Sequence, residues 1–168
     1  MNDANGTAGA ATLIRLDKVG KSYFRGKQPV EVLKDLDLTM PEGAFEALMG
    51  PSGSGKSTLL NLIAGLDSPS RGSITISGQD LGKMSEAQRA AWRAQNVGFI
   101  FQTYNLLPVL TAAENVELPL LLTSVSSSQR RQRALTALRV VGLEDRAHHR
   151  PDQLSGGQQQ RVAFARAI

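Results

Sequence analysis

The sequence predicts an α/β fold in which an α/β lobe is followed by a helical lobe. The first 100 residues are rich in strand-like apolar runs separated by helical stretches, whereas the remainder shows the apolar spacing of helices. A length of 168 residues suits one domain of ordinary size. We place a disordered tail at residues 1–12, the α/β lobe at residues 13–102 and the helical lobe at residues 103–168.

Strands are expected where apolar residues alternate with polar ones or form short runs. Leu13–Val19 and Leu36–Met40 alternate in this way and are joined by the loop KSYFRGKQP, and Ser73–Ser77 is a third alternating run. The apolar runs Phe45–Met49 and Val97–Phe101 are predicted to be buried strands.

Helices are expected where apolar residues recur at helical spacing after a capping residue. Ser85 is a good N-cap for the second helix, and Gly142 is a good stop for the fourth. Four of the predicted helices span Ser57–Gly65, Ser85–Gln95, Thr111–Leu118 and Ser128–Val141.

Composition excludes several functional classes. The chain contains no cysteine, so it has neither disulfides nor thiolate metal sites. Eight arginines and three acidic residues lie between Gln129 and Ile168, but a single aromatic residue, Phe164, lies among the arginines. Solvated helix faces therefore explain this charge better than a nucleic-acid surface. The most apolar stretch, Leu106–Leu122, is broken by two prolines and two glutamates and cannot span a bilayer.

A phosphate-binding motif follows the apolar run at 45–49. The segment GPSGSGKST matches the P-loop pattern G-x-x-x-x-G-K-S/T, in which glycines let backbone N–H groups surround phosphate oxygens at a helix N-terminus. Lys56 would reach the β- and γ-phosphates, and the Ser57 hydroxyl would bind Mg²⁺. The candidate nucleotide-binding residues are Gly50, Pro51, Ser52, Gly53, Ser54, Gly55, Lys56, Ser57 and Thr58.

A second glycine-rich helix start lies about 100 residues further along the chain. LSGGQ, from Leu154 to Gln158, places a capping serine and two glycines at the beginning of a predicted helix, which makes another anion site. One nucleotide needs a single P-loop, so the second site requires a separate explanation. At this point the sequence resembles the ATP-binding subunits of ABC transporters, whose signature motif is LSGGQ.

The resemblance covers about Leu13 to Ile168 and implies roles for further residues. Tyr23 matches the aromatic residue that stacks on adenine, and Gln102 matches the glutamine that contacts Mg²⁺ and the attacking water. The segment FQTYNLLPVLTAAENVELPLLL is most similar to the lipoprotein-release and macrolide-export branch. In this family two subunits pair head to tail, which implies that Ser155, Gly156, Gly157 and Gln158 bind the ATP of the partner.

The resemblance implies a P-loop NTPase fold of the ABC ATPase type, with N-terminal antiparallel strands, a parallel core sheet and a helical subdomain. It implies an ATP hydrolase that uses ATP and Mg²⁺ and powers export or lipoprotein transport. Its partners would be a second ATP-binding subunit and an integral membrane permease, with no nucleic acid. It would lie in the cytoplasm, peripherally on the cytoplasmic face of the cell membrane.

Three features complicate this expectation. The family's Asp-Glu strand and its later sensor histidine have no counterpart here, so we expect the C-terminal part of the core to be missing and the chain alone to be inactive. Val140–Asp145 is a helix terminus rather than a substitute metal site, and His148 and His149 are expected to be solvated loop residues. Glu46 lies in a predicted central strand, where it would need a cation or would weaken the strand.

Two other functions stay open from the sequence. One is a truncated fragment that binds a nucleotide or a partner without hydrolysis. The other is a soluble ABC protein of DNA repair or translation, which the export-like segment after Gln102 disfavours.

Overall fold

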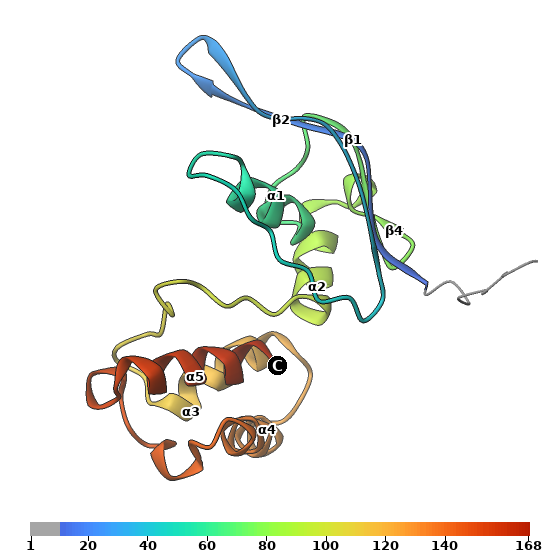
Figure 1. The fold of residues 1–168 in the computed structure, drawn as a ribbon. Coiled ribbons are helices and arrows are strands. Elements are labelled where there is room, and N and C mark those ends of the chain that lie inside the picture. Colours follow the sequence, from blue (N-terminus) through green and yellow to red (C-terminus); the bar gives the residue numbers. More distant parts are fainter. Residues whose placement is uncertain (1–10) are drawn as a thin grey trace, which may run out of the picture. The chain divides into compact units, whose positions relative to one another are not determined.

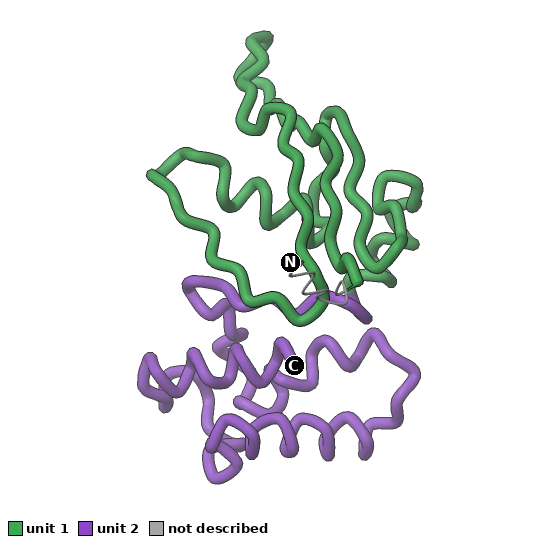
Figure 2. The backbone as a smooth tube through the Cα atoms, turned by 45° about the vertical axis from the view of Figure 1, so that its right-hand side comes forward, with its two compact units in different colours: residues 1–93 green, residues 94–168 purple. Residues whose placement is uncertain are grey.

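The computed structural model describes residues 11–168, so most of the predicted tail at residues 1–12 lies outside the described residues. The chain forms two compact units, residues 1–93 and residues 94–168 (Figure 2). The division falls between Arg93 and Ala94, whereas the sequence suggested a boundary after Gln102.

The first unit is built on a four-stranded sheet in the order β2-β1-β3-β4 (Figure 1). Every pairing among the described strands is antiparallel, which confirms the predicted N-terminal antiparallel strands. The strands are β1 (Thr12–Arg25), β2 (Gln28–Pro41), β3 (Arg71–Ile76) and β4 (Gln79–Asp80).

The loop predicted between the first two strands is wrong, because β1 and β2 continue through it as a hairpin. Arg25 pairs with Gln28, and Gly26 takes a φ of 63° in the short turn between them. Tyr23 pairs with Val30, so the aromatic and β-branched residues of this segment favour the pleated strand over a loop.

The two strands predicted for a parallel sheet are also wrong within the described residues. Residues 44–50 and 97–101 are irregular, and the side chain of Phe45 is 99% exposed. A parallel strand needs a hydrogen-bonded neighbour and cover on both faces, and no strand among residues 11–168 pairs with either run. Glu46 is exposed, so the predicted cost of burying its carboxylate does not arise.

Apolar residues of the sheet and of helix α1 (Lys56–Ile63) form the core of the first unit. Leu62 and Ile74 are almost fully buried, and α1 contacts β2 and β3. Helix α2 (Glu86–Asn96) follows the short 3₁₀ helix Leu81–Lys83. The Oγ atom of Ser85 accepts a hydrogen bond from the Gln88 N–H, which confirms Ser85 as the N-cap.

The second unit packs three helices around small side chains. These are α3 (Ala112–Glu117), α4 (Ser127–Val140) and α5 (Gly156–Ala167), and each contacts the other two. Alanines let the helices approach closely, and Leu138 and Val162 are fully buried among them. Short 3₁₀ helices connect these elements at Leu118–Leu122, Glu144–Arg146 and Pro151–Gln153.

Asn115 is the buried polar side chain of this core, and all of its hydrogen-bonding groups have partners. Its Oδ1 accepts from the Leu107 N–H at 2.7 Å, and its Nδ2 donates to the carbonyls of Leu107, Leu110 and Thr111. Because an unpaired buried amide is costly, these bonds fix the segment before α3 on the helix.

Gly142 ends α4, as the sequence predicted. Its φ is 68°, its N–H bonds to the Arg139 carbonyl, and the Leu143 N–H bonds to the Leu138 carbonyl at 2.8 Å. This is a Schellman motif, in which a left-handed residue closes the helix and two apolar residues meet across it. Glu144 pairs with Arg139, so Val140–Asp145 is a helix terminus as expected.

No helix within residues 11–168 combines the length and the apolar character that a membrane span requires.

We expect Gly142→Ala to lower the free energy of unfolding by about 1 kcal/mol, because alanine is strained at a positive φ. A Cβ atom there would lie 3.6 Å from the nearest atom, Arg161 Nη1, so steric overlap does not contribute. Urea denaturation followed by circular dichroism measures the change.

Gly157→Ala is the matched control, because Gly157 lies in the first turn of α5 with open space around it. Its stability should equal or exceed that of the wild type. Equal stability of Gly142→Ala and the wild type would contradict the assignment of Gly142 as the C-terminal cap.

Candidate functional site

The candidate phosphate site is the loop between residues 50 and 55 together with the start of α1. Gly53 and Gly55 take φ values of 83° and 85°, which side chains rarely adopt. A Cβ atom on Gly55 would also lie 2.9 Å from Leu33 Cδ2 and 3.2 Å from Val32 Cγ1. Glycine is therefore required here both by backbone conformation and by contact with β2.

Lys56 lies across this loop. Its Nζ donates to the carbonyls of Gly50 and Pro51 at 2.8 and 2.7 Å, and it lies 3.3 Å from Ser54 Oγ. Within the described part of the chain, no carboxylate forms an ion pair with this ammonium. Neutral oxygens thus hold a positive charge over the loop, where it can meet an anion.

Helix α1 begins without a side-chain cap, because its N-cap is Gly55. The first N–H groups of a helix have no intrahelical partners, and the positive end of the helix dipole points toward them. The exposed Ser57 lies in this first turn. Together these groups make a cradle whose charge and dipole favour an anion.

A magnesium ion in this cradle would be coordinated by few protein side chains. Among residues 11–168, no three His, Cys, Asp or Glu side chains gather as a metal site. Mg²⁺ commonly keeps several waters and binds substrate phosphates with few protein ligands, so a hydroxyl such as Ser57 is a suitable contact.

Tyr23 lies in β1 near the loop. It pairs with Val30 of β2, and Val32 and Leu33 of the same strand contact Gly55. Two to three residues of a strand correspond to ~7–10 Å along β2, so the strand position that pairs with Tyr23 lies close to the loop. Tyr23 is 40% exposed, and its hydroxyl donates to Asp67 at 2.8 Å.

The LSGGQ segment forms the start of α5 in the second unit. Ser155 Oγ accepts from the Gln158 N–H at 3.3 Å, and Gln158 Oε1 accepts from the Ser155 N–H at 2.8 Å. This capping box leaves Gly156 and Gly157 on the exposed first turn. Nothing within 4 Å would meet a Cβ atom on Gly157, so a ligand can approach the backbone closely there.

Gln102 lies exposed in a turn of the second unit. Helix α5 contacts two residues that follow it, Tyr104 and Asn105. Tyr104 and Asn105 have φ values of 58° and 47°, an uncommon pair of left-handed residues. The Arg166 guanidinium donates to both of their carbonyls at 2.7 Å. Burial lowers the pKa of Arg166. Sequence reasoning missed Arg166, because its partners lie about 60 residues away and no pattern marks them.

The structure thus groups the predicted site residues within units. In the first unit, Tyr23 and the loop at 50–58 both lie against β2. In the second unit, the hydroxyl of Tyr104, two residues after Gln102, would lie 3.7 Å from a Cβ atom on Gly156. Sequence reasoning did not identify Lys21 and Asp67, which contact Tyr23, because Asp67 joins them from 44 positions further along the chain than Tyr23.

Comparison with known proteins places these features in a family. Residues 33–168 match the family described as ABC transporter. The chain is 50% identical over 156 residues to the uncharacterized ABC transporter ATP-binding protein YvrO of Bacillus subtilis, covering 93% of this chain and 68% of the relative. It is 49% identical to the macrolide export ATP-binding/permease protein MacB of Burkholderia pseudomallei, covering 93% of this chain and 24% of that protein.

Solved structures agree with the sequence relatives. The chain superimposes with a TM-score of 0.83 on the ATP-binding cassette MJ0796 of Methanocaldococcus jannaschii, described as a dimer in a post-hydrolysis state bound to ADP and Pi. The identity is 46%, and the match covers 93% of this chain and 69% of the other. The glycine-rich loop, the LSGGQ helix and these matches together establish that the chain belongs to the ABC transporter family.

Proposed function

We propose that this chain belongs to the ATP-binding subunit of an ABC transporter, which powers export or lipoprotein and lipid-linked transport through ATP binding and hydrolysis. The observation that carries the proposal is the loop at 50–55, where left-handed glycines and Lys56 surround the uncapped start of α1. This arrangement suits a triphosphate, because N–H groups, the helix dipole and an ammonium all favour negative charge.

Each candidate residue has a role that follows from its chemistry. The loop N–H groups and Lys56 bind the phosphates, and they stabilise the charge on the phosphoryl group that is transferred to water. The exposed face of Tyr23 stacks on the base. Ser57 would contact Mg²⁺, which supplies further neutralisation of the phosphate charge when bound.

The start of α5 is proposed to bind the γ-phosphate of a partner's ATP in a head-to-tail dimer. The capped but exposed first turn at Gly156 and Gly157 supports this role, because it offers N–H groups without side-chain obstruction. A relative of known structure is described as a dimer, which supports the pairing of two such chains. The permease partner and the location at a membrane are proposed from MacB, whose name joins an ATP-binding and a permease protein.

Removal of the phosphate-facing cation tests nucleotide binding. Lys56→Ala should weaken ATP binding about ten- to hundredfold, because a charged hydrogen bond to phosphate is lost (~1.5–3 kcal/mol). Isothermal titration calorimetry measures the affinity. Lys83→Ala is the control, since Lys83 is an exposed lysine of the same unit, and its ATP affinity should be unchanged. Equal affinities of Lys56→Ala and the wild type would refute the assignment.

Mixed dimers test the role of α5. Chains carrying Lys56→Ala are mixed with chains carrying Gly156→Asp, whose carboxylate would repel a phosphate. The head-to-tail arrangement then yields one site with both motifs intact, so the mixture should dimerise with ATP more than either variant alone. Analytical ultracentrifugation with and without ATP measures the dimer fraction. No gain in the mixture would rule out the head-to-tail arrangement.

A further inference from the structure

The carboxylate of Asp67 lies where three donors from two parts of the first unit converge. Its Oδ1 accepts from Lys21 Nζ at 2.6 Å and from the Ser68 N–H at 2.7 Å. Its Oδ2 accepts from the Tyr23 hydroxyl at 2.8 Å. Lys21 also donates to the Ser68 carbonyl at 2.7 Å. The turn after α1 is therefore joined directly to β1, at the strand position of Tyr23.

Asp67 is held in its ionised form. Burial raises the pKa of its carboxyl group, but hydrogen bonds from Lys21, Tyr23 and the Ser68 N–H together lower that pKa below its ordinary value. An ionised carboxylate only accepts hydrogen bonds, so the Tyr23 hydroxyl must donate. This fixes the direction of the phenol O–H and holds the oxygen end of the ring at Asp67.

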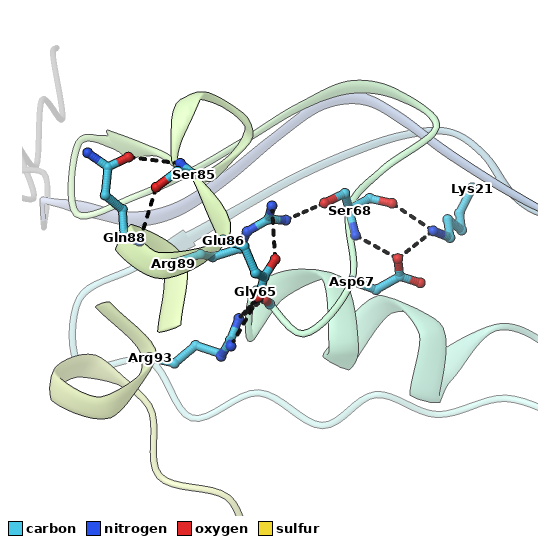
Figure 3. Close-up of polar contacts among 9 residues, drawn as sticks. All are labelled: Lys21, Gly65, Asp67, Ser68, Ser85, Glu86, Gln88, Arg89 and Arg93. Carbon is cyan, nitrogen blue, oxygen red and sulfur yellow. Dashed lines mark hydrogen bonds and ion pairs between the residues drawn. The ribbon is translucent and has the colours of Figure 1, made fainter. Parts of the chain in front are cut away.

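The turn that carries Asp67 is anchored from the opposite side by two arginines of α2 (Figure 3). Arg89 donates to the Ser68 hydroxyl, and Arg93 donates to the Gly65 carbonyl at 2.6 Å. The side chains of Arg89 and Arg93 are 15% and 21% exposed. Because the turn is held on both sides, Asp67 has a defined position. Its hydrogen bond to the Tyr23 hydroxyl then restrains the position of Tyr23.

One face of the Tyr23 ring is already occupied. The Lys21 ammonium lies 4.9 Å from the ring centroid, a cation–π distance, and the Lys21 side chain is only 11% exposed. Tyr23 as a whole residue is 40% exposed, which leaves surface of this residue open to a planar group. The phosphates of the same nucleotide would lie on the loop at 50–55. This loop contacts β2 two to three residues from Val30, which pairs with Tyr23.

From these contacts we infer that Asp67 is a positioning residue for the nucleotide base: with Lys21, it fixes the Tyr23 ring so that a purine stacks on its free face. This inference rests on the proposed role of Tyr23. It predicts that loss of the Tyr23–Asp67 bond weakens binding of ATP but not of an inorganic polyphosphate, which has no base to stack.

The test compares ATP with inorganic tripolyphosphate as ligands of single and double variants. Tyr23→Phe keeps the ring and removes only the hydroxyl, whereas Asp67→Asn keeps the shape and removes the charge. Each should weaken ATP binding about three- to tenfold, the effect of one hydrogen bond, and leave tripolyphosphate binding within about twofold. The ATP affinity of the double variant should equal that of the single variant with the lower ATP affinity, because both changes remove the same interaction.

Asp37→Asn is the matched control. Asp37 accepts from the Lys18 N–H at 2.8 Å and from Lys18 Nζ at 2.6 Å, so it resembles Asp67 in its lysine and backbone partners but has no tyrosine. Its affinity for both ligands should equal that of the wild type. Thermal unfolding of every variant identifies any general loss of structure.

Two results would overturn the inference. If Asp67→Asn weakens both ligands equally, its role is structural, and if Tyr23→Phe binds ATP as the wild type does, the hydroxyl does not position the ring. Tyr23→Ala separates these results from a failure of the proposed function. Weak ATP binding by Tyr23→Ala with normal binding by Tyr23→Phe rejects only the role of Asp67, whereas normal binding by Tyr23→Ala rejects stacking itself.

Discussion

A backbone that turns successive N–H groups toward one point must adopt left-handed conformations, and the rest of the candidate site depends on this constraint. Gly53 and Gly55 meet it with φ values that other residues rarely take. Because Gly55 has no Cβ, it also packs directly on Val32 and Leu33 of β2. The sheet thereby fixes both the phosphate loop and, through the pairing of Val30 with Tyr23, the aromatic side of the site.

The helix starts of the two units use different chemistry. Helix α1 has no side-chain cap and carries a lysine at its first position, whereas α5 has a Ser155–Gln158 capping box. Helices α3 and α4 have capping boxes too, so capping does not distinguish α5. What distinguishes α5 is the pair of glycines in its first turn, which leaves room for a ligand at the backbone. This difference agrees with two separate anion sites, one in each unit.

The sequence predicted best what depends on neighbouring residues. The start of α2 at Ser85, the end of α4 at Gly142 and the phosphate loop were all predicted, because capping and left-handed turns are local chemistry. The structure of the runs 45–49 and 97–101 was predicted wrongly. A strand forms only beside a hydrogen-bonded partner strand, and within residues 11–168 no strand pairs with either run. The contacts of Asp67 and Arg166 join residues more than 40 positions apart, beyond the reach of any local pattern.

The central claim is that the left-handed glycine at the start of α1 creates the phosphate site. Its most direct test is calorimetry of tripolyphosphate binding to Gly55→Ala and to Gly78→Ala. Gly78 also has a positive φ, 76°, but it lies in the turn between β3 and β4, where a Cβ atom would meet nothing within 4 Å. We predict that Gly55→Ala loses at least about tenfold in affinity while Gly78→Ala binds as the wild type does. Equal affinities for the two variants would contradict the claim.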